Sequence, residues 1–118
     1  VVCVTGDGGY MMTVHALSTA MQYQLPILCV VFNNNALGMV RGHQAPDRRI
    51  ASEFVDTDNA AVARGFGAFG VQVKDSRDLP EAIRQAQASG LPAVIDVLID
   101  GGPSPDDWRA GAHRAGET

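Results

Sequence analysis

The sequence predicts an α/β fold, with a mostly parallel, doubly wound sheet flanked by helices. Short apolar runs rich in β-branched residues recur along the chain, and stretches with helical spacing or polar loops separate them. Glycine, proline or asparagine stands at most of the boundaries. Strands that alternate with helices are typical of parallel sheets, and 118 residues leave room for one such domain.

The first predicted unit is a strand, a helix and a second strand. Residues 1–5 (VVCVT) form a β-branched run that glycine stops, so we expect a buried strand. Apolar residues then recur at helical spacing from Val14 to Met21, and Pro26 ends that helix. Residues 27–32 (ILCVVF) form the second buried strand. Strands joined by a helix are expected to be parallel, with a right-handed crossover.

The second half of the chain continues the alternation. A short helix is expected over residues 37–42, followed by a polar, proline-containing connection over residues 43–55. An N-cap within residues 56–58 (DTD) starts a helix that runs through Arg64. Residues 70–73 (GVQV) form the third predicted strand.

The last predicted helix begins at Asp78, which is expected to be its N-cap, with Glu81 at the capping-box position. That helix runs to about Ser89, and residues 93–99 (AVIDVLI) form the fourth strand. Residues 101–118 show no periodicity and are expected to form a loose carboxyl-terminal tail.

Composition and charge narrow the possible partners. The net charge is −4 and no basic run is present, which argues against a nucleic-acid partner. No apolar stretch reaches transmembrane length, so we expect no membrane partner. Cys3 and Cys29 fall in predicted buried strands without Cys-x-x-Cys spacing, and we expect reduced core residues of a cytoplasmic protein. One folded domain is expected over residues 1–100.

Two polar motifs follow the first two predicted strands. Gly6-Asp7-Gly8 comes directly after the first strand, and Asn34, within a run of asparagines, follows Asp7 by 27 positions at the end of the second. The carboxyl ends of parallel strands meet at one edge of a sheet, where ligands of open α/β sheets bind. An aspartate in a phosphate-type glycine turn needs a cation between its charge and the phosphate. Gly8 and Gly9 let the backbone approach an anion closely.

The expected cation is Mg²⁺. One carboxylate, one amide oxygen and one carbonyl, completed by phosphate oxygens and water, form the hard octahedral set that Mg²⁺ prefers at about 2.0–2.1 Å. Each motif alone is more often a tight turn. Their order on consecutive parallel strands is what predicts a metal-bridged diphosphate site.

The segment that carries both motifs resembles the diphosphate-binding domain of thiamine-diphosphate-dependent enzymes. The family signature is GDG followed, after about two dozen or more residues, by NN. This chain reads GDGGYMMTVHALSTAMQYQLPILCVVFNNNALGMVRGHQ. The resemblance continues into FVDTDNAAVARGFGAFGVQV and LPAVIDVLID, and so covers roughly residues 1–100. It implies the thiamine-diphosphate-binding fold, here without its upstream elements.

The resemblance also implies site residues. Mg²⁺ is expected to be bound by the side chains of Asp7 and Asn34 and by the carbonyl of Ala36. Arg41 is a candidate for holding a substrate carboxylate, and His43 for substrate contact or proton transfer. The residues expected to bind thiamine diphosphate are Gly6, Asp7, Gly8, Gly9, Asn34, Ala36, Leu37, Gly38 and Met39.

Within the family, NNNALGMVR is similar to acetolactate synthases, and HALSTAMQYQLP is closer to aryl 2-oxo acid decarboxylases such as benzoylformate decarboxylase. Acetolactate synthases usually carry Gln-Trp where this chain has Gly42-His43, and often Glu where it has Ala16, which leaves the substrate open. The function implied is the Mg²⁺- and diphosphate-binding part of a thiamine-diphosphate-dependent carboligase or decarboxylase. The resemblance implies that this enzyme acts on a 2-oxo acid and is acetolactate-synthase-like.

The resemblance further implies partners outside the chain. Family members have a pyrimidine-binding domain whose glutamate activates the cofactor, and Glu53, Glu81 and Glu117 do not stand in a similar context. No catalytic residue is therefore expected in this chain, which alone is expected to be inactive. The parent protein is expected to be a homodimer or tetramer, because active sites in the family form between two subunits.

Two other functions stay open. A non-catalytic regulatory or assembly module would keep the same fold, although it has no need of both Asp7 and Asn34. A flavodoxin- or receiver-like phosphate binder would explain an aspartate at a strand end, but not the asparagine partner.

Overall fold

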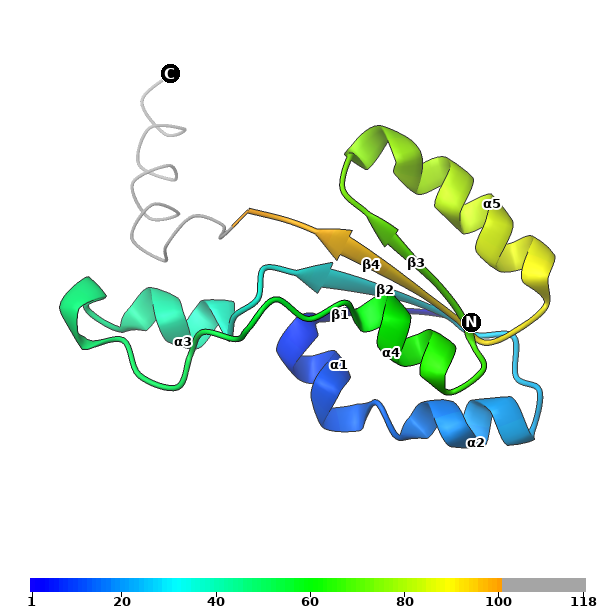
Figure 1. Ribbon diagram of the computed structural model, residues 1–118, viewed down its shortest axis with the longest axis horizontal. Helices are drawn as coiled ribbons and strands as arrows, with labels where there is room; N and C mark the ends of the chain where they lie inside the picture. The colour runs from blue at the N-terminus through cyan, green and yellow to red at the C-terminus, as the bar shows by residue number, and fades with distance from the viewer. Residues whose placement is uncertain (101–118) are drawn as a thin grey trace, which may run out of the picture.

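The structure, a computed structural model, describes residues 1–100; the predicted tail over residues 101–118 lies outside the described residues. The described part is a parallel sheet with helices on both faces (Figure 1), which confirms the predicted fold class. The elements are β1 (Val2–Gly6), α1 (Asp7–Thr13), α2 (Ala16–Gln22), β2 (Leu28–Asn33), α3 (Gly38–His43), η1 (Pro46–Arg48), α4 (Asn59–Gly65), β3 (Phe69–Val73), η2 (Ser76–Asp78), α5 (Leu79–Ser89) and β4 (Ala93–Leu98).

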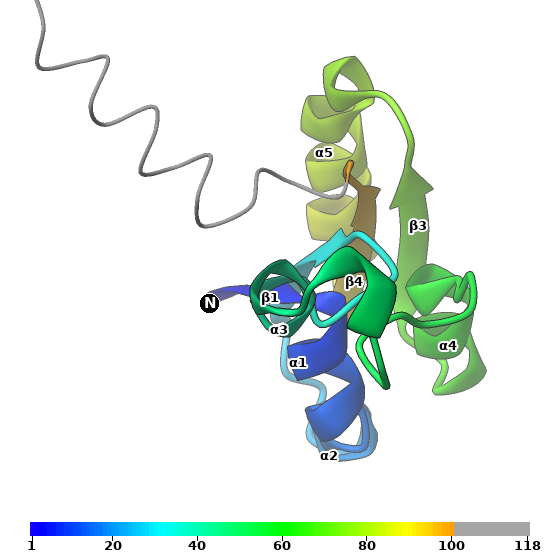
Figure 2. The same cartoon turned by 90° about the vertical axis from the view of Figure 1, so that its left-hand side faces the viewer.

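The strand order β1-β2-β4-β3 shows how the chain winds. Helices α1 and α2 connect β1 to β2, and α4 leads from β2 to β3; all three lie on one face of the sheet in Figure 1. The chain then reverses, and α5 returns it to β4 across the opposite face (Figure 2). Right-handed crossovers put helices on opposite faces when the winding reverses. The sheet is therefore doubly wound.

Each face of the sheet has its own apolar core. On the central strand β4, Val94 and Ile95 are both 0% exposed and face opposite cores. This burial on both faces explains the continuous apolar run in the sequence. The core on the α5 side contains Leu28, Val30, Val73, Ala82, Ala86, Ala93, Ile95 and Val97, and the other core contains Tyr10, Leu17, Cys29, Val31, Ala63, Ala68 and Val94.

Strand β1 is exposed, so the prediction of a buried strand was wrong for the described part of the chain. Val2 and Val4 are 63% and 62% exposed, and Cys3 is exposed as well. The reason is position: β1 is an edge strand, and β2 is its one neighbour in the described sheet. Cys29, opposite Cys3 in the register, is buried as predicted, and both thiols are free.

The segment between β1 and β2 contains two helices where one was predicted. The first of them, α1, starts directly at Asp7, inside the glycine motif. The second starts at Ala16 and carries the buried Leu17 and Ala20 of the predicted apolar face. In the described part of the chain, no helix has the length and apolar character needed to cross a membrane.

The two predicted N-caps have different outcomes. Asp58 caps α4 as expected, because its Oδ1 accepts a hydrogen bond of 2.8 Å from the Ala61 N–H. Asp78 makes no capping bond to α5, and that prediction was wrong. Its backbone is helical (φ −85°, ψ −11°), as the last residue of η2, whereas an N-cap needs an extended backbone. Glu81 contacts Arg84 and Gln85 instead of completing a capping box.

Burial of two weak acids predicts the alkaline stability of the fold. Burial raises the pKa of the Cys29 thiol from 9.0 to about 12 and that of Tyr10 from 10.0 to about 12. Because the folded pKa values are higher, the unfolded state loses these protons first as pH rises. We expect the free energy of unfolding to fall from about pH 9 towards pH 12, as measured by urea denaturation at each pH. In Cys29→Ala the decline should begin nearer pH 10, and an unchanged onset would contradict the assignment to Cys29.

Candidate functional site

The two sequence motifs meet at the carboxyl edge of the sheet. β1 and β2 pair in parallel, with Gly6 opposite Phe32, so Asp7 and the asparagine run leave the sheet side by side. The contact between them is direct, because the Ala36 N–H donates a hydrogen bond of 3.0 Å to Asp7 Oδ2. The Gly8 N–H donates one of 2.9 Å to the other oxygen, Oδ1. Two backbone donors thus orient a carboxylate that is 5% exposed, and each oxygen keeps a further lone pair.

The asparagines have different surroundings. Asn33 is 1% exposed, and its Oδ1 accepts a hydrogen bond of 3.0 Å from the Asn35 N–H. Asn35 has a left-handed backbone (φ 52°), which reverses the chain between Asn34 and Ala36. Asn34 is half-buried, and its side chain lies against Gly38: a Cβ on Gly38 would come within 2.8 Å of Asn34 Nδ2. A glycine is therefore what lets the start of α3 approach the asparagine.

A cavity of about 400 Å³ opens where these elements meet. Its lining contains all nine residues predicted to bind the cofactor, together with Phe32, Val40 and Ile99. The polar residues Asp7 and Asn34 line it together with Ala36, and Leu37 and Met39 supply apolar surface. The three groups predicted to bind the metal therefore lie around one space.

Arg41 and His43, the predicted substrate residues, do not line this cavity. Both lie on α3, beyond the cavity residues Gly38 and Met39. His43 is exposed, and its Nδ1 lies 2.8 Å from the Met39 carbonyl oxygen, so the ring is turned back onto its own helix.

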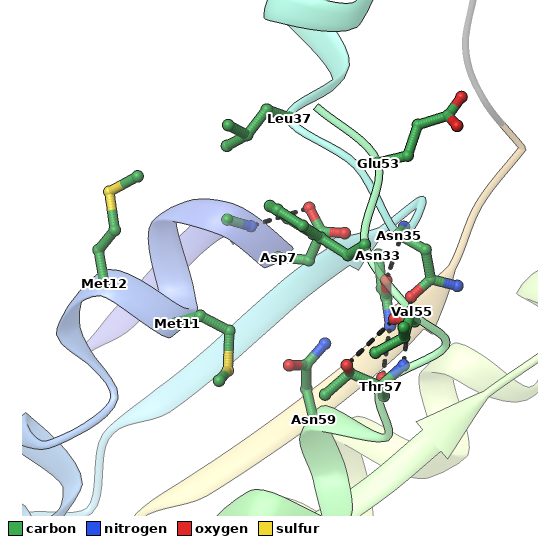
Figure 3. Close-up of a pocket in the computed structure, with 12 residues that line it drawn as sticks. Asp7, Met11, Met12, Asn33, Asn35, Leu37, Glu53, Val55, Thr57 and Asn59 are labelled. Carbon is green, nitrogen blue, oxygen red and sulfur yellow. Dashed lines mark hydrogen bonds between the residues drawn. The ribbon is translucent and has the colours of Figure 1, made fainter. Parts of the chain in front are cut away.

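A second, larger cavity of about 600 Å³ lies on the other side of Asp7, Gly8 and Leu37, which line both spaces. Figure 3 shows its lining, with Met11 and Met12 projecting from α1 and with Val55 and Thr57 opposite. Asn34 and Ala36 are not part of its lining, so it lacks two of the predicted metal ligands. Sequence reasoning missed this cavity, because the segment around residues 53–57 reaches α1 only through the fold.

Comparison with known proteins is consistent with this geometry. Residues 1–97 match the family model described as thiamine pyrophosphate enzyme, C-terminal TPP binding domain. The putative thiamine pyrophosphate-containing protein YdaP of Bacillus subtilis is 38% identical over 104 residues, which are 86% of this chain and 18% of that protein. The large subunit of acetolactate synthase isozyme 3 of Escherichia coli is 38% identical over 109 residues, or 86% and 19% of the two chains.

Among solved structures, benzoylformate decarboxylase from Polynucleobacter necessarius superposes with a TM-score of 0.80 at 26% identity, over 89% of this chain and 20% of that chain. A parallel α/β domain with a cavity at the carboxyl ends of its strands is thus the class that fold and site define. The chain belongs to the thiamine pyrophosphate enzyme family and corresponds to its C-terminal TPP-binding domain. It spans about a fifth of the length of the relatives it matches.

Proposed function

We propose that this chain is the Mg²⁺- and diphosphate-binding part of a thiamine-diphosphate-dependent carboligase or decarboxylase that acts on a 2-oxo acid, similar to acetolactate synthase. The observation that carries the proposal is the 3.0 Å hydrogen bond between the Ala36 N–H and Asp7 Oδ2. It holds the carboxylate beside the turn formed by Asn33, Asn34 and Asn35 (the asparagine turn). The carboxylate lines the cavity together with the other eight predicted residues.

The donor set fits Mg²⁺ better than a transition metal. Asp7, Asn34 and Ala36 offer a carboxylate, an amide oxygen and a carbonyl, which are the hard oxygen ligands that Mg²⁺ prefers. Over residues 1–100 no cluster of three or more His, Cys, Asp or Glu side chains is placed to hold a metal ion. A cation bound here therefore needs phosphate oxygens and water to complete its coordination, as Mg²⁺ commonly does.

Each part of the cavity has a separate task in this proposal. Asp7, Asn34 and the Ala36 carbonyl hold the cation, and Gly8 and Gly9 let the diphosphate approach the backbone. Leu37 and Met39 supply the apolar part of the lining. Thiamine diphosphate, when bound, supplies the chemistry that cleaves the bond between the carboxylate and the carbonyl carbon of a 2-oxo acid.

The remaining functional assignments belong to the same proposal. Arg41 and His43 are assigned to the substrate side, since they follow the cavity residues on α3. The activating glutamate is assigned to a pyrimidine-binding domain or subunit outside this chain, in a cytoplasmic homodimer or tetramer. Because the activating glutamate is assigned outside this chain, turnover requires the complete protein.

The proposal is tested by calorimetric titration of thiamine diphosphate into the full-length protein, with Mg²⁺ and with excess EDTA. We expect binding with Mg²⁺ and a loss of affinity of at least about tenfold without it. Equal affinity under both conditions would refute the metal bridge. Turnover of pyruvate or benzoylformate then separates an enzyme from a non-catalytic module, which would bind the cofactor without consuming either acid.

Replacing Gly38 tests whether Asn34 takes part in metal binding. In Gly38→Ala the new Cβ would lie 2.8 Å from Asn34 Nδ2, so the amide must move. We expect the Mg²⁺ concentration for half-maximal thiamine diphosphate binding to rise by about tenfold or more. Gly65→Ala is the matched control, because outside its chain neighbours and its own helix backbone no atom of residues 1–100 lies within 4 Å of its new Cβ. The same half-saturating Mg²⁺ concentration in both variants would argue against Asn34 as a ligand.

A further inference from the structure

A carboxylate buried in the sheet has no part in the site described above. Asp96 lies in the middle of the central strand β4 and is 0% exposed. Its Oδ2 accepts hydrogen bonds from Asn33 Nδ2 (3.3 Å), Gln72 Nε2 (3.1 Å) and the Asn59 N–H (3.1 Å). Its Oδ1 accepts one from Asn59 Nδ2 at 3.1 Å. Four donors from three elements thus converge on one side chain, and a buried acceptor of this kind is expensive to remove.

One of the four donors, Asn33 Nδ2, belongs to a side chain that also contacts the asparagine turn. Asn33 Nδ2 donates to Asp96 and, at 3.1 Å, to the Thr57 carbonyl, while Asn33 Oδ1 accepts from the Asn35 N–H. Both ends of the Asn33 amide are therefore in use, and its orientation is fixed. Figure 3 shows Asn33, Asn35 and Thr57 grouped beside Asp7.

The turn that Asn33 holds contains a left-handed residue. Asn35 is not glycine but has a left-handed backbone (φ 52°), a conformation that asparagine adopts more readily than other non-glycine residues and that local hydrogen-bonding contacts help to hold. The Asn35 side chain contributes two of these contacts, because its Oδ1 accepts from the Thr57 N–H and its Nδ2 donates to Asp56. Asn34 and Ala36 flank this residue, and the Ala36 N–H is the donor to Asp7.

We propose that Asp96 is a positioning residue for the metal site: through Asn33 it holds the left-handed turn at Asn35, which sets the directions of the Asn34 side chain and of the Ala36 backbone. Asp96 does not line either cavity and contacts no proposed ligand directly. The inference rests on the proposed function, because it concerns the same cation.

Substitution of Asp96 tests the proposal, with Gln72→Leu as the matched control. Asp96→Ala removes the acceptor for Asn33, whereas Gln72→Leu removes a hydrogen bond of similar length to the same carboxylate without touching Asn33. In the full-length protein we expect amide hydrogen exchange at Asn35 and Ala36 to be about tenfold faster in Asp96→Ala, and unchanged in Gln72→Leu. The half-saturating Mg²⁺ concentration for thiamine diphosphate binding should rise by about tenfold in Asp96→Ala alone.

A second variant covers the case in which Asp96→Ala does not fold. Asp96→Asn keeps an oxygen for Asn33. Asn59 Oδ1 is buried and has no hydrogen-bond partner among residues 1–100, so the new N–H group of Asp96→Asn can bond to it once the Asn59 amide turns over. We expect Asp96→Asn to keep the slow exchange of the wild-type turn. Fast exchange at Asn35 and Ala36 in folded Asp96→Asn, or equal exchange in Asp96→Ala and Gln72→Leu, would overturn the proposal.

The two readouts also separate this inference from the proposed function. If the wild-type protein binds no thiamine diphosphate at any Mg²⁺ concentration, the proposed function fails, and hydrogen exchange alone decides whether Asp96 holds the turn. If the wild-type protein binds the cofactor but Asp96→Ala keeps the wild-type Mg²⁺ dependence, the proposed function stands and the positioning role is refuted.

Discussion

Replacing Asp7 with alanine is expected to remove the Mg²⁺-dependent part of thiamine diphosphate binding and to weaken binding by at least about 100-fold. Loss of groups that merely support a metal ligand commonly costs 10- to 100-fold in affinity, and loss of a ligand itself should cost no less. Asp7 is the one proposed ligand with a formal charge, and its two oxygens are already oriented by hydrogen bonds from the Gly8 and Ala36 N–H groups. Calorimetry of the variant with and without Mg²⁺ measures the effect.

The matched control for Asp7→Ala is Asp58→Ala, which also removes one negative charge. Asp58 caps α4 through the Ala61 N–H, so its loss should lower the free energy of unfolding by about 1 kcal/mol. It should leave the Mg²⁺ dependence of binding unchanged, because Asp58 lines neither cavity. Equal losses of affinity in the two variants would mean that Asp7 acts through overall charge or stability and not as a ligand.

Replacing Gly70 with alanine is expected to lower the free energy of unfolding by about 2–4 kcal/mol, a larger loss than removal of the Asp58 cap. A Cβ on Gly70 would lie 2.2 Å from the backbone oxygen of Ala60 and 3.0 Å from its carbonyl carbon. Backbone cannot rotate away as a side chain can, so α4 would have to move off β3. Urea denaturation of the wild type and the variant measures the difference.

Gly65→Ala is again the matched control, and in this variant the free energy of unfolding is expected to change in the opposite direction. Gly65 is the last residue of α4, and its new Cβ would contact no other element of the described part of the chain within 4 Å. Alanine favours helix over glycine by about 0.8–1.0 kcal/mol in a helix interior, so a small gain in stability is expected at this end position. A stability loss in Gly70→Ala no larger than the effect of Gly65→Ala would show that α4 and β3 can separate at little cost.

Much of the fold was predictable because local conformation follows periodicity. The apolar runs in residues 27–32 and 93–99 predicted β2 and β4 to within one residue at each end. Gly90 ends α5 with a left-handed backbone (φ 65°), as a glycine after a helix commonly does. Asp58 and Asp78 show the limit of this reasoning. Both precede a helical pattern, but only the backbone that leads into each helix decides whether the side chain can cap it.

The burial of a strand was predictable where the described sheet has a neighbouring strand on each side of it. β4 lies between β2 and β3 and is buried, whereas β1 has an apolar run of similar composition and is exposed at the sheet edge. An apolar pattern indicates that a strand can be buried. It does not indicate whether a second neighbouring strand covers it. For the same reason Cys29 and Cys3 differ in exposure although they are opposite each other in the register.

The sequence by itself determined the class of fold, the family and the choice of residues around the 400 Å³ cavity, since each depends on short motifs and on residue order. Only the tertiary structure decided the strand order, the second cavity, and the connection of Asp96 to the asparagine turn. Asn33 and Asp96 are 63 positions apart, and no periodicity along the chain encodes which side chains meet across that separation. Their contact follows from the reversal that places β4 beside β2.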